Sequence, residues 1–159
     1  MSPKDTTTIE AAGVALEGAL GAAIADRANI FDMTQAAEDA VLRPRDAGRW
    51  PHELRAALAA RIARLNYEAA LAERHLAAAG GFAALADAAN DGVSEGYGAV
   101  IAFMDKVAAH TRAVEASDIT ALQSAGIADA DIVRLAELNA FLAYQLRVIA
   151  GLRLIGNAP

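Results

Sequence analysis

The sequence predicts an all-α protein made of a single domain. The chain has 159 residues, which is the usual size of one domain. Its hydrophobic fraction is 55%, above the roughly 45–50% of soluble proteins, and much of the excess is alanine, which favours helix. Apolar residues return at three- and four-residue steps, and no stretch alternates in polarity as a strand does. We therefore expect roughly six or seven helices.

The predicted domain covers residues 1–159, with an N-terminal helical extension and loop over 1–50 and a core over 51–156. A first helix is expected over about Ile9–Arg27. Three glycines within it each cost about 1 kcal/mol of helix propensity, so we expect close packing against a neighbouring helix to compensate.

A second helix is expected over about Asn29–Leu42, with Ile30, Met33 and Ala37 near its apolar face. It ends before Pro44, because the residue before a proline is disfavoured in the helical region. The loop that follows, Arg43–Pro51, contains three arginines and the only tryptophan, Trp50. It is either an anion-binding loop or, as we favour, a connector in which Trp50 packs against the start of the next helix.

A long third helix is expected over Pro51–Ala79 and ends at Gly80-Gly81. Shorter helices are expected over Phe82–Ala89 and Ala99–His110, and another between an N-cap at Ser117 and a stop at Gly126. The last helix is expected over about Asp129–Leu154, capped by Asp129. Beyond Leu138 it is apolar on most sides, which predicts a subunit interface and therefore a homo-oligomer.

Composition excludes several classes of function. The chain has no cysteine, so disulfides, thiol nucleophiles and thiolate metal sites are absent. A formal charge of −6 opposes binding to nucleic acid or to anionic membranes. The three histidines, His52, His75 and His110, lie in separate segments, so we expect neither a metal site nor a cofactor.

The apolar run Ala11–Ala25 has some character of a signal peptide. Glu17 interrupts it, and the charge of Lys4 is cancelled by Asp5, so we expect a cytoplasmic protein. The run is also too short to span a membrane.

His75 is the candidate catalytic residue of the third predicted helix. At 100° per residue it lies on the boundary of the apolar stripe, on the same flank as Glu68. Seven residues of helix separate the two by about 10.5 Å, so they are expected to act together only through a substrate, a water or a residue from another helix. The alternative is that His75 is a hydrogen-bonded residue at the edge of the core.

Two stretches carry a family resemblance. LRAALAARIARLNYEAALAERHLAAAG, which is Leu54–Gly80, resembles the central helix pair of the alkylhydroperoxidase D-like and carboxymuconolactone decarboxylase-like superfamily. DITALQSAGIADADIVRLAELNAFLAYQLRVIAGLRLIG, which is Asp118–Gly156, looks like the closing segment of that superfamily. Together they cover somewhat under half of the chain. The resemblance implies an alkylhydroperoxidase D-like fold and a homo-oligomer, from dimer to hexamer.

The resemblance also implies where a site would lie. Peroxidase members use a glutamate followed by C-x-x-C-x-x-x-H, and with His75 as the histidine these positions fall at Ala56, Glu68 and Leu71. Thiol peroxidase chemistry is therefore lost. The decarboxylase branch typically has a carboxylate four residues before the histidine, where this chain has Leu71.

The polar residues of the last helix that are expected to reach the same cleft are Asn139, Tyr144 and Arg147. Arg147, at the position of the superfamily's late arginine, is expected to pair with Glu68, to hold a substrate carboxylate or to tie subunits together. Two functional hypotheses follow. One is a cofactor-free acid/base enzyme acting on a small organic acid or lactone, and the other is a non-catalytic structural or small-ligand-binding oligomer that kept the fold but lost the site.

Overall fold

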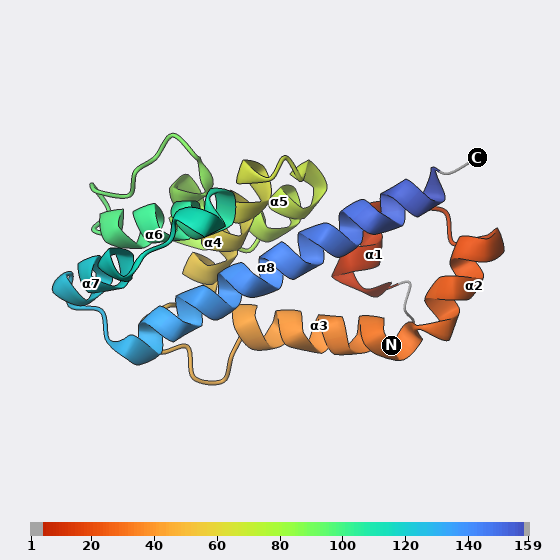
Figure 1. Cartoon of the computed structure of the whole chain (residues 1–159), viewed down its shortest axis with the longest axis horizontal. Helices are drawn as coiled ribbons and strands as arrows, with labels where there is room; N and C mark the ends of the chain where they lie inside the picture. Colours follow the sequence, from red (N-terminus) through yellow and green to blue (C-terminus); the bar gives the residue numbers. More distant parts are fainter. Residues whose placement is uncertain (1–4, 158–159) are drawn as a thin grey trace.

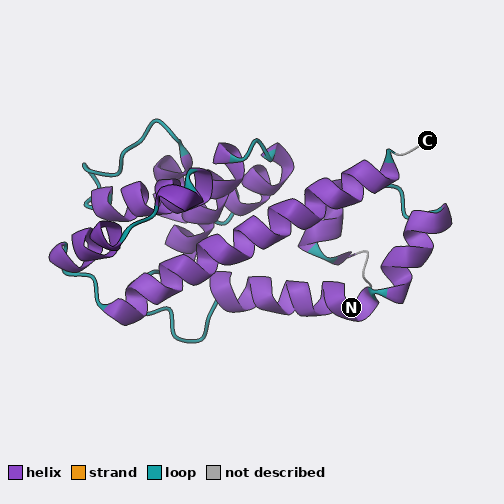
Figure 2. Ribbon diagram, viewed as in Figure 1, coloured by secondary structure: helices purple, strands orange, loops and turns teal. Residues whose placement is uncertain are grey.

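A computed structural model describes residues 5–157, and this part of the chain is helical and contains no strand (Figure 2). The all-α prediction is therefore confirmed for these residues. In chain order the elements are α1 (Thr7–Ala12), α2 (Gly18–Asp26), α3 (Ala28–Leu42), α4 (His52–Leu65), α5 (Ala69–Leu76), the 3-10 helix η2 (Gly80–Ala86), α6 (Gly98–Ala109), the 3-10 helix η3 (Thr111–Ala113), α7 (Ala116–Ser124) and α8 (Asp129–Gly156).

The helices are arranged around α4 and α8. Every residue from Leu54 to Ala63 of α4 is buried, because α5, η2, α6 and α8 pack around this helix. The longest helix, α8, runs across most of the molecule, with α3 along one side of it and α4 to α7 along the other (Figure 1). The predicted last helix is thus confirmed, and so are the second helix and the helix before His110 within a residue or two.

The predicted helix over Ile9–Arg27 is wrong, because the chain breaks between α1 and α2. Gly13 (φ +64°) and Gly18 (φ +60°) both adopt the left-handed backbone conformation that glycine tolerates best. Of the residues in α2, Ile24 alone is buried. Gly13 and Gly18 therefore serve a turn, and Gly21 is approached by the backbone of Leu16 and not by a neighbouring helix as we expected.

The predicted helix over Pro51–Ala79 is wrong as well, because it is interrupted at Tyr67. This residue has φ +60°, while the N–H of Tyr67 donates to Arg64 O (3.0 Å) and the N–H of Glu68 donates to Ala63 O (2.9 Å). Those two bonds define the Schellman motif that ends α4, with a tyrosine where glycine is usual. The break resets the helical phase, so residues 54–65 and 69–76 do not form one continuous stripe.

Smaller corrections concern helix ends and one helix face. The segment from Gly80 is the 3-10 helix η2 instead of an α-helix. The N-cap of α7 is Glu115 and not Ser117, and the N-cap of α8 is Ala128 and not Asp129. The buried face of α3 consists of Phe31, Thr34, Gln35, Glu38 and Leu42. Met33, predicted on the apolar face, is 65% exposed.

The loop before α4 is held in place by two side chains. Trp50 is buried and its indole N–H donates to Asp131 O (2.8 Å). Arg55 donates to three backbone oxygens, those of Trp50, Val41 and Ala47. These bonds agree with the interpretation of the loop as a connector anchored by its tryptophan.

Arg61, in the middle of α4, fixes the segment between η2 and α6. It is 1% exposed, and its guanidinium donates to both carboxylate oxygens of Asp105 on α6 (2.6 Å each). The remaining donors reach the backbone oxygens of Leu85, Asp87, Ala88 and Asn90. A segment with little regular structure is thereby tied to the central helix.

Tyr67→Gly is expected to stabilise the protein by about 1 kcal/mol, because a left-handed conformation costs a non-glycine residue roughly 1–2 kcal/mol. The tyrosine side chain is 96% exposed, so its removal loses little packing. Tyr67→Val, which puts a β-branched residue at the same φ, is expected to be destabilising. Urea unfolding of the two variants checks this, and equal stabilities would contradict the assigned conformation.

Arg61→Met is expected to destabilise the protein by about 3 kcal/mol or more, because it leaves buried carbonyl oxygens without donors. Arg61→Lys is expected to recover little of this, since an ammonium cannot donate in the planar fork of a guanidinium. Urea unfolding measures both, with Arg112→Met on the exposed η3 as the matched control, expected within about 0.5 kcal/mol of wild type. If Arg61→Met unfolds at the same urea concentration as the wild type, the role assigned to this guanidinium is wrong.

Candidate functional site

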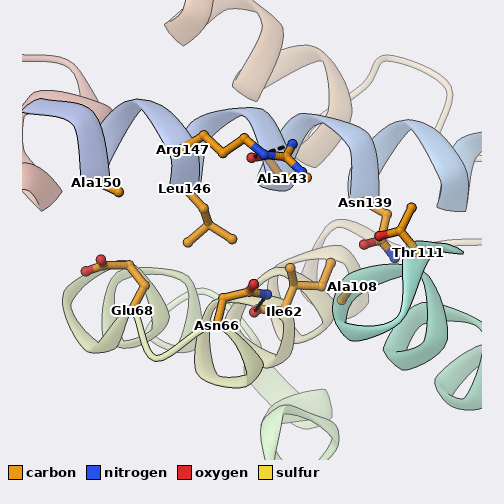
Figure 3. A pocket seen from close by; sticks show the side chains of 10 residues that line it. All are labelled: Ile62, Asn66, Glu68, Ala108, Thr111, Asn139, Ala143, Leu146, Arg147 and Ala150. Atoms are coloured by element: carbon orange, nitrogen blue, oxygen red, sulfur yellow. Dashed lines mark hydrogen bonds between the residues drawn. The ribbon is translucent and has the colours of Figure 1, made fainter.

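A cleft of about 270 Å³ lies between α8, the junction of α4 and α5, and the end of α6 (Figure 3). Five polar side chains line it: Asn66, Glu68, Thr111, Asn139 and Arg147. The rest of its wall is apolar and consists of Ile62, Ala108, Ala143, Leu146 and Ala150. A wall of this kind suits a small molecule with an apolar body and a few polar groups.

Adjoining hollows extend the cleft along α8. One lies beside η3 and another between α6 and α8, and Thr111 and Arg147 line both of them as well as the cleft. Arg147 therefore stands where the three hollows meet.

The guanidinium of Arg147 keeps most of its donors available. Its one hydrogen bond within residues 5–157 runs to Ala143 O, one turn earlier in α8 (3.3 Å), and it has no ion pair there. In Figure 3 the side chain lies along α8 toward Ala143. A guanidinium has five N–H donors, so Arg147 can bind a carboxylate through two of them.

Asn139 contributes an acceptor from inside the protein. The residue is 1% exposed, and its amide nitrogen donates to Met104 O (3.1 Å). That bond fixes the orientation of the amide, since a carbonyl can only accept. The amide oxygen Oδ1 is buried and has no hydrogen-bond partner in the described chain. A buried acceptor of this kind is satisfied by a donor from a ligand or a water.

Glu68 lines the cleft, but its carboxylate is already paired. Arg153 near the end of α8 donates to both of its oxygens, at 2.5 and 2.8 Å. The same guanidinium donates to Ala11 O (2.6 Å) and Ala12 O (3.0 Å) at the end of α1. The arginine that pairs with Glu68 is therefore Arg153 and not Arg147, and the pair joins α1, α5 and α8.

His75 lies apart from the cleft. Its side chain is 4% exposed, it is not among the residues that line the hollows described above, and its Nε2 has no partner in the described chain. Burial lowers the pKa of His75 from 6.5 to about 4, and the charges of Arg74 and Arg43 add to this shift. The imidazole is neutral at pH 7.

Tyr144 lies outside the cleft, on the part of α8 that adjoins α3. Its hydroxyl and the Thr34 hydroxyl on α3 form a hydrogen bond of 2.9 Å, and Tyr144 lines a separate shallow hollow with Ile30, Met33 and Phe141. Of the five site residues predicted from sequence, the structure thus gathers Glu68, Asn139 and Arg147 in one cleft and leaves His75 and Tyr144 outside it.

Several polar residues of the structure were not predicted from the sequence. Thr111 and Asn66 line the cleft, and Arg153 is the partner of Glu68. Buried Glu38 accepts a hydrogen bond from Gln145 (2.7 Å), and burial raises the pKa of Glu38. For Glu38 the sequence does offer a signal of burial. It precedes Leu42 by four residues, which places both side chains on the same face of the helix.

Comparison of the chain with protein-family models, with curated proteins and with solved structures finds no match in any of the three.

Within residues 5–157, no group of three or more His, Asp or Glu side chains is placed to hold a metal ion. By length and composition, α8 is the one helix in that part long and apolar enough to cross a membrane, a test that core helices of soluble proteins also pass. The cleft therefore has to be interpreted from its own geometry.

Protonation of His75 is expected to destabilise the fold in acid. Its folded pKa of about 4 lies below the unfolded value of 6.5, so the unfolded chain takes up the proton first as the pH falls. The free energy of unfolding is therefore not reduced by His75 above pH 6.5. As the pH falls from 6.5 to 4, it decreases by about 3 kcal/mol in total.

His75→Leu is expected to remove this dependence and to match or exceed wild-type stability at pH 7, since the unpartnered Nε2 is replaced by a methyl group. Urea unfolding between pH 4 and pH 7 measures the difference between the two proteins. His52→Leu, which changes an exposed histidine, is the control. A constant difference between wild type and His75→Leu across this range would refute the assignment.

Proposed function

We propose that the protein binds a small organic acid in the cleft between α4, α6 and α8. The observation that carries the proposal is that one cleft is lined by two groups suited to a ligand: the Arg147 guanidinium, with most of its donors available, and Asn139 Oδ1, a buried acceptor without a partner in the described chain. Arg147 binds the carboxylate of the ligand, and Asn139 accepts from a hydroxyl or N–H group on it. Thr111 supplies a hydroxyl that donates or accepts as the ligand requires.

The size and wall of the cleft restrict the ligand class. A volume of about 270 Å³ lies at the small end for ligand pockets. The alanines of α6 and α8, with Ile62 and Leu146, favour a flat or short apolar body. The ligand class is therefore a small aromatic or aliphatic acid that also carries a hydrogen-bond donor.

Membership of the alkylhydroperoxidase D-like and carboxymuconolactone decarboxylase-like superfamily is part of the same proposal. Its support is the resemblance of Leu54–Gly80 and Asp118–Gly156, together with the helical structure of both stretches. Glu68, which stands at the first cysteine position of the peroxidase pattern, is the N-cap residue of α5 and lines the cleft. The absence of cysteine removes the thiol chemistry but leaves the cleft.

Binding is better supported than acid/base catalysis. His75 is not among the residues lining the cleft, and the carboxylate of Glu68 is held by two bonds from Arg153. A general base has to reach the proton that it takes, directly or through one water. The non-catalytic alternative therefore has the stronger case, in a protein that we expect to act in the cytoplasm without a cofactor.

The test is a titration of the isotope-labelled protein with 4-hydroxybenzoate and with lactate, each of which carries a carboxylate and a hydroxyl, followed by NMR chemical shifts. Saturable shifts are expected in the amides of α8 around Asn139–Ala150 and near Thr111. Arg147→Gln is expected to weaken binding about tenfold or more, as loss of a charged hydrogen-bond donor does.

The matched control is Arg45→Gln, which removes an exposed arginine that has no ion pair in the described chain and lies outside the cleft. It is expected to bind as wild type does. If neither acid produces saturable shifts at concentrations on the order of 10 mM, or if both variants bind equally, the proposal is wrong.

A further inference from the structure

The outward face of α8 is apolar although solvent reaches it. The exposed side chains along this face include Val133, Ala136, Ala140, Tyr144, Ala150 and Leu154. Between positions 130 and 154, the two exposed residues of this helix that carry charge are Glu137 and Arg147. A surface helix normally presents a polar face to water, so a face of this composition marks an interaction surface.

We infer that this face of α8 packs antiparallel against the same face of a second copy of the chain. The arrangement is a two-fold pairing centred at the level of Leu142, and it sets Glu137 beside Arg147 of the second copy. At 100° per residue, all positions paired in this way lie on the outward side of the helix, while Leu142 itself points into the core.

The side chains brought together are complementary in size. Tyr144 meets Ala140 of the second copy, Val133 meets Gly151, and Leu154 meets Ala130. In each pair a large side chain lies against a small one, which lets two helix backbones approach closely. Among residues 5–157, no atom outside the backbone of α8 and the two chain neighbours lies within 4 Å of the position that a Cβ would take on Gly151, so there is space for a side chain there.

The charges are complementary as well. Neither Glu137 nor Arg147 forms an ion pair within residues 5–157. In the antiparallel register, Glu137 of each copy lies beside Arg147 of the other, so one dimer contains two ion pairs between the chains. A parallel pairing in register would instead set Glu137 against Glu137 and Arg147 against Arg147, which is unfavourable. Charge and size thus select the same orientation and the same register.

The surroundings of α8 leave room for the second copy. Figure 1 shows α8 running across most of the molecule, with α3 on one side and α6 and α7 on the other. The contact from position 130 to position 154 is about 36 Å long. Shallow hollows flank it on both sides, one lined by Met33 and Tyr144 and one by Ala140 and Arg147. The exposed Met33 side chain adds apolar area beside the helix pair.

The inference does not rest on the proposed ligand, but the two share Arg147. A carboxylate bound to this guanidinium displaces Glu137 of the second copy. Ligand binding and self-association are therefore measured separately, so that either one can fail while the other holds.

The first experiment is sedimentation equilibrium of the ligand-free full chain between about 1 and 100 μM, where a dimer is expected. Glu137→Arg and Arg147→Glu are each expected to weaken dimerisation at least tenfold, because like charges then meet. The double variant Glu137→Arg/Arg147→Glu is expected to restore it. A monomeric wild type, or a double variant no tighter than the single ones, overturns the inference.

The second experiment uses the absence of cysteine in the chain. Val133→Cys/Gly151→Cys places two thiols about 27 Å apart on one helix, too far for a bond within the chain. Mild oxidation is expected to give a covalent dimer of this double variant and none of either single variant, as seen on non-reducing gels. A single variant that links as fast as the double one indicates a parallel pairing and overturns the inference.

Discussion

The geometry of the cleft depends on the buried guanidinium of Arg61. Its helix, α4, has no free face, so the surrounding elements have to be positioned relative to it. Arg61 does this for the segment after η2 through backbone oxygens and for α6 through Asp105. The next residue, Ile62, forms part of the cleft wall, and the same α6 brings Ala108 and Thr111 to its edge. A buried charge is favourable when every donor finds an acceptor, and a neutral residue at this position leaves the acceptors without partners.

A second charged pair closes the other end of the cleft. The left-handed turn at Tyr67 directs the chain so that Glu68 starts α5 facing α8, where Arg153 meets it and also binds the end of α1. This pair determines what the cleft can do. Both oxygens of the Glu68 carboxylate accept hydrogen bonds from Arg153, which fixes this side chain as part of the framework of the cleft. Glu68 thus contributes to structure, and Arg147, which has no such partner, remains available for binding.

Helices that follow from a regular apolar spacing were predicted correctly from the sequence. Features that depend on the conformation or the contacts of a single residue were not. The helices over Ala28–Leu42 and Asp129–Gly156 follow from regular apolar spacing and from Pro44. The break at Tyr67 was not predictable, because the usual glycine of a Schellman motif is absent there. Glu68, Asn139 and Arg147 were predicted to share a cleft and do so. His75 and Tyr144 were predicted to line the same cleft but lie outside it. A helical wheel gives the direction of a side chain but does not show which other elements pack against it. Arg61 and Arg153 were missed since their partners lie far along the chain.

The two proposals meet at Arg147, and linkage between them follows from thermodynamics. An ordinary surface helix presents many charges to water, but the outward face of α8 has two, and one of them is the cation of the cleft. If the ligand carboxylate and Glu137 of a second copy use the same guanidinium, each weakens the binding of the other by the same free energy. The ligand then favours separate chains, and a high protein concentration lowers the apparent ligand affinity. The small number of charges on α8, which makes the helix face suitable for association, therefore also couples association to the contents of the cleft.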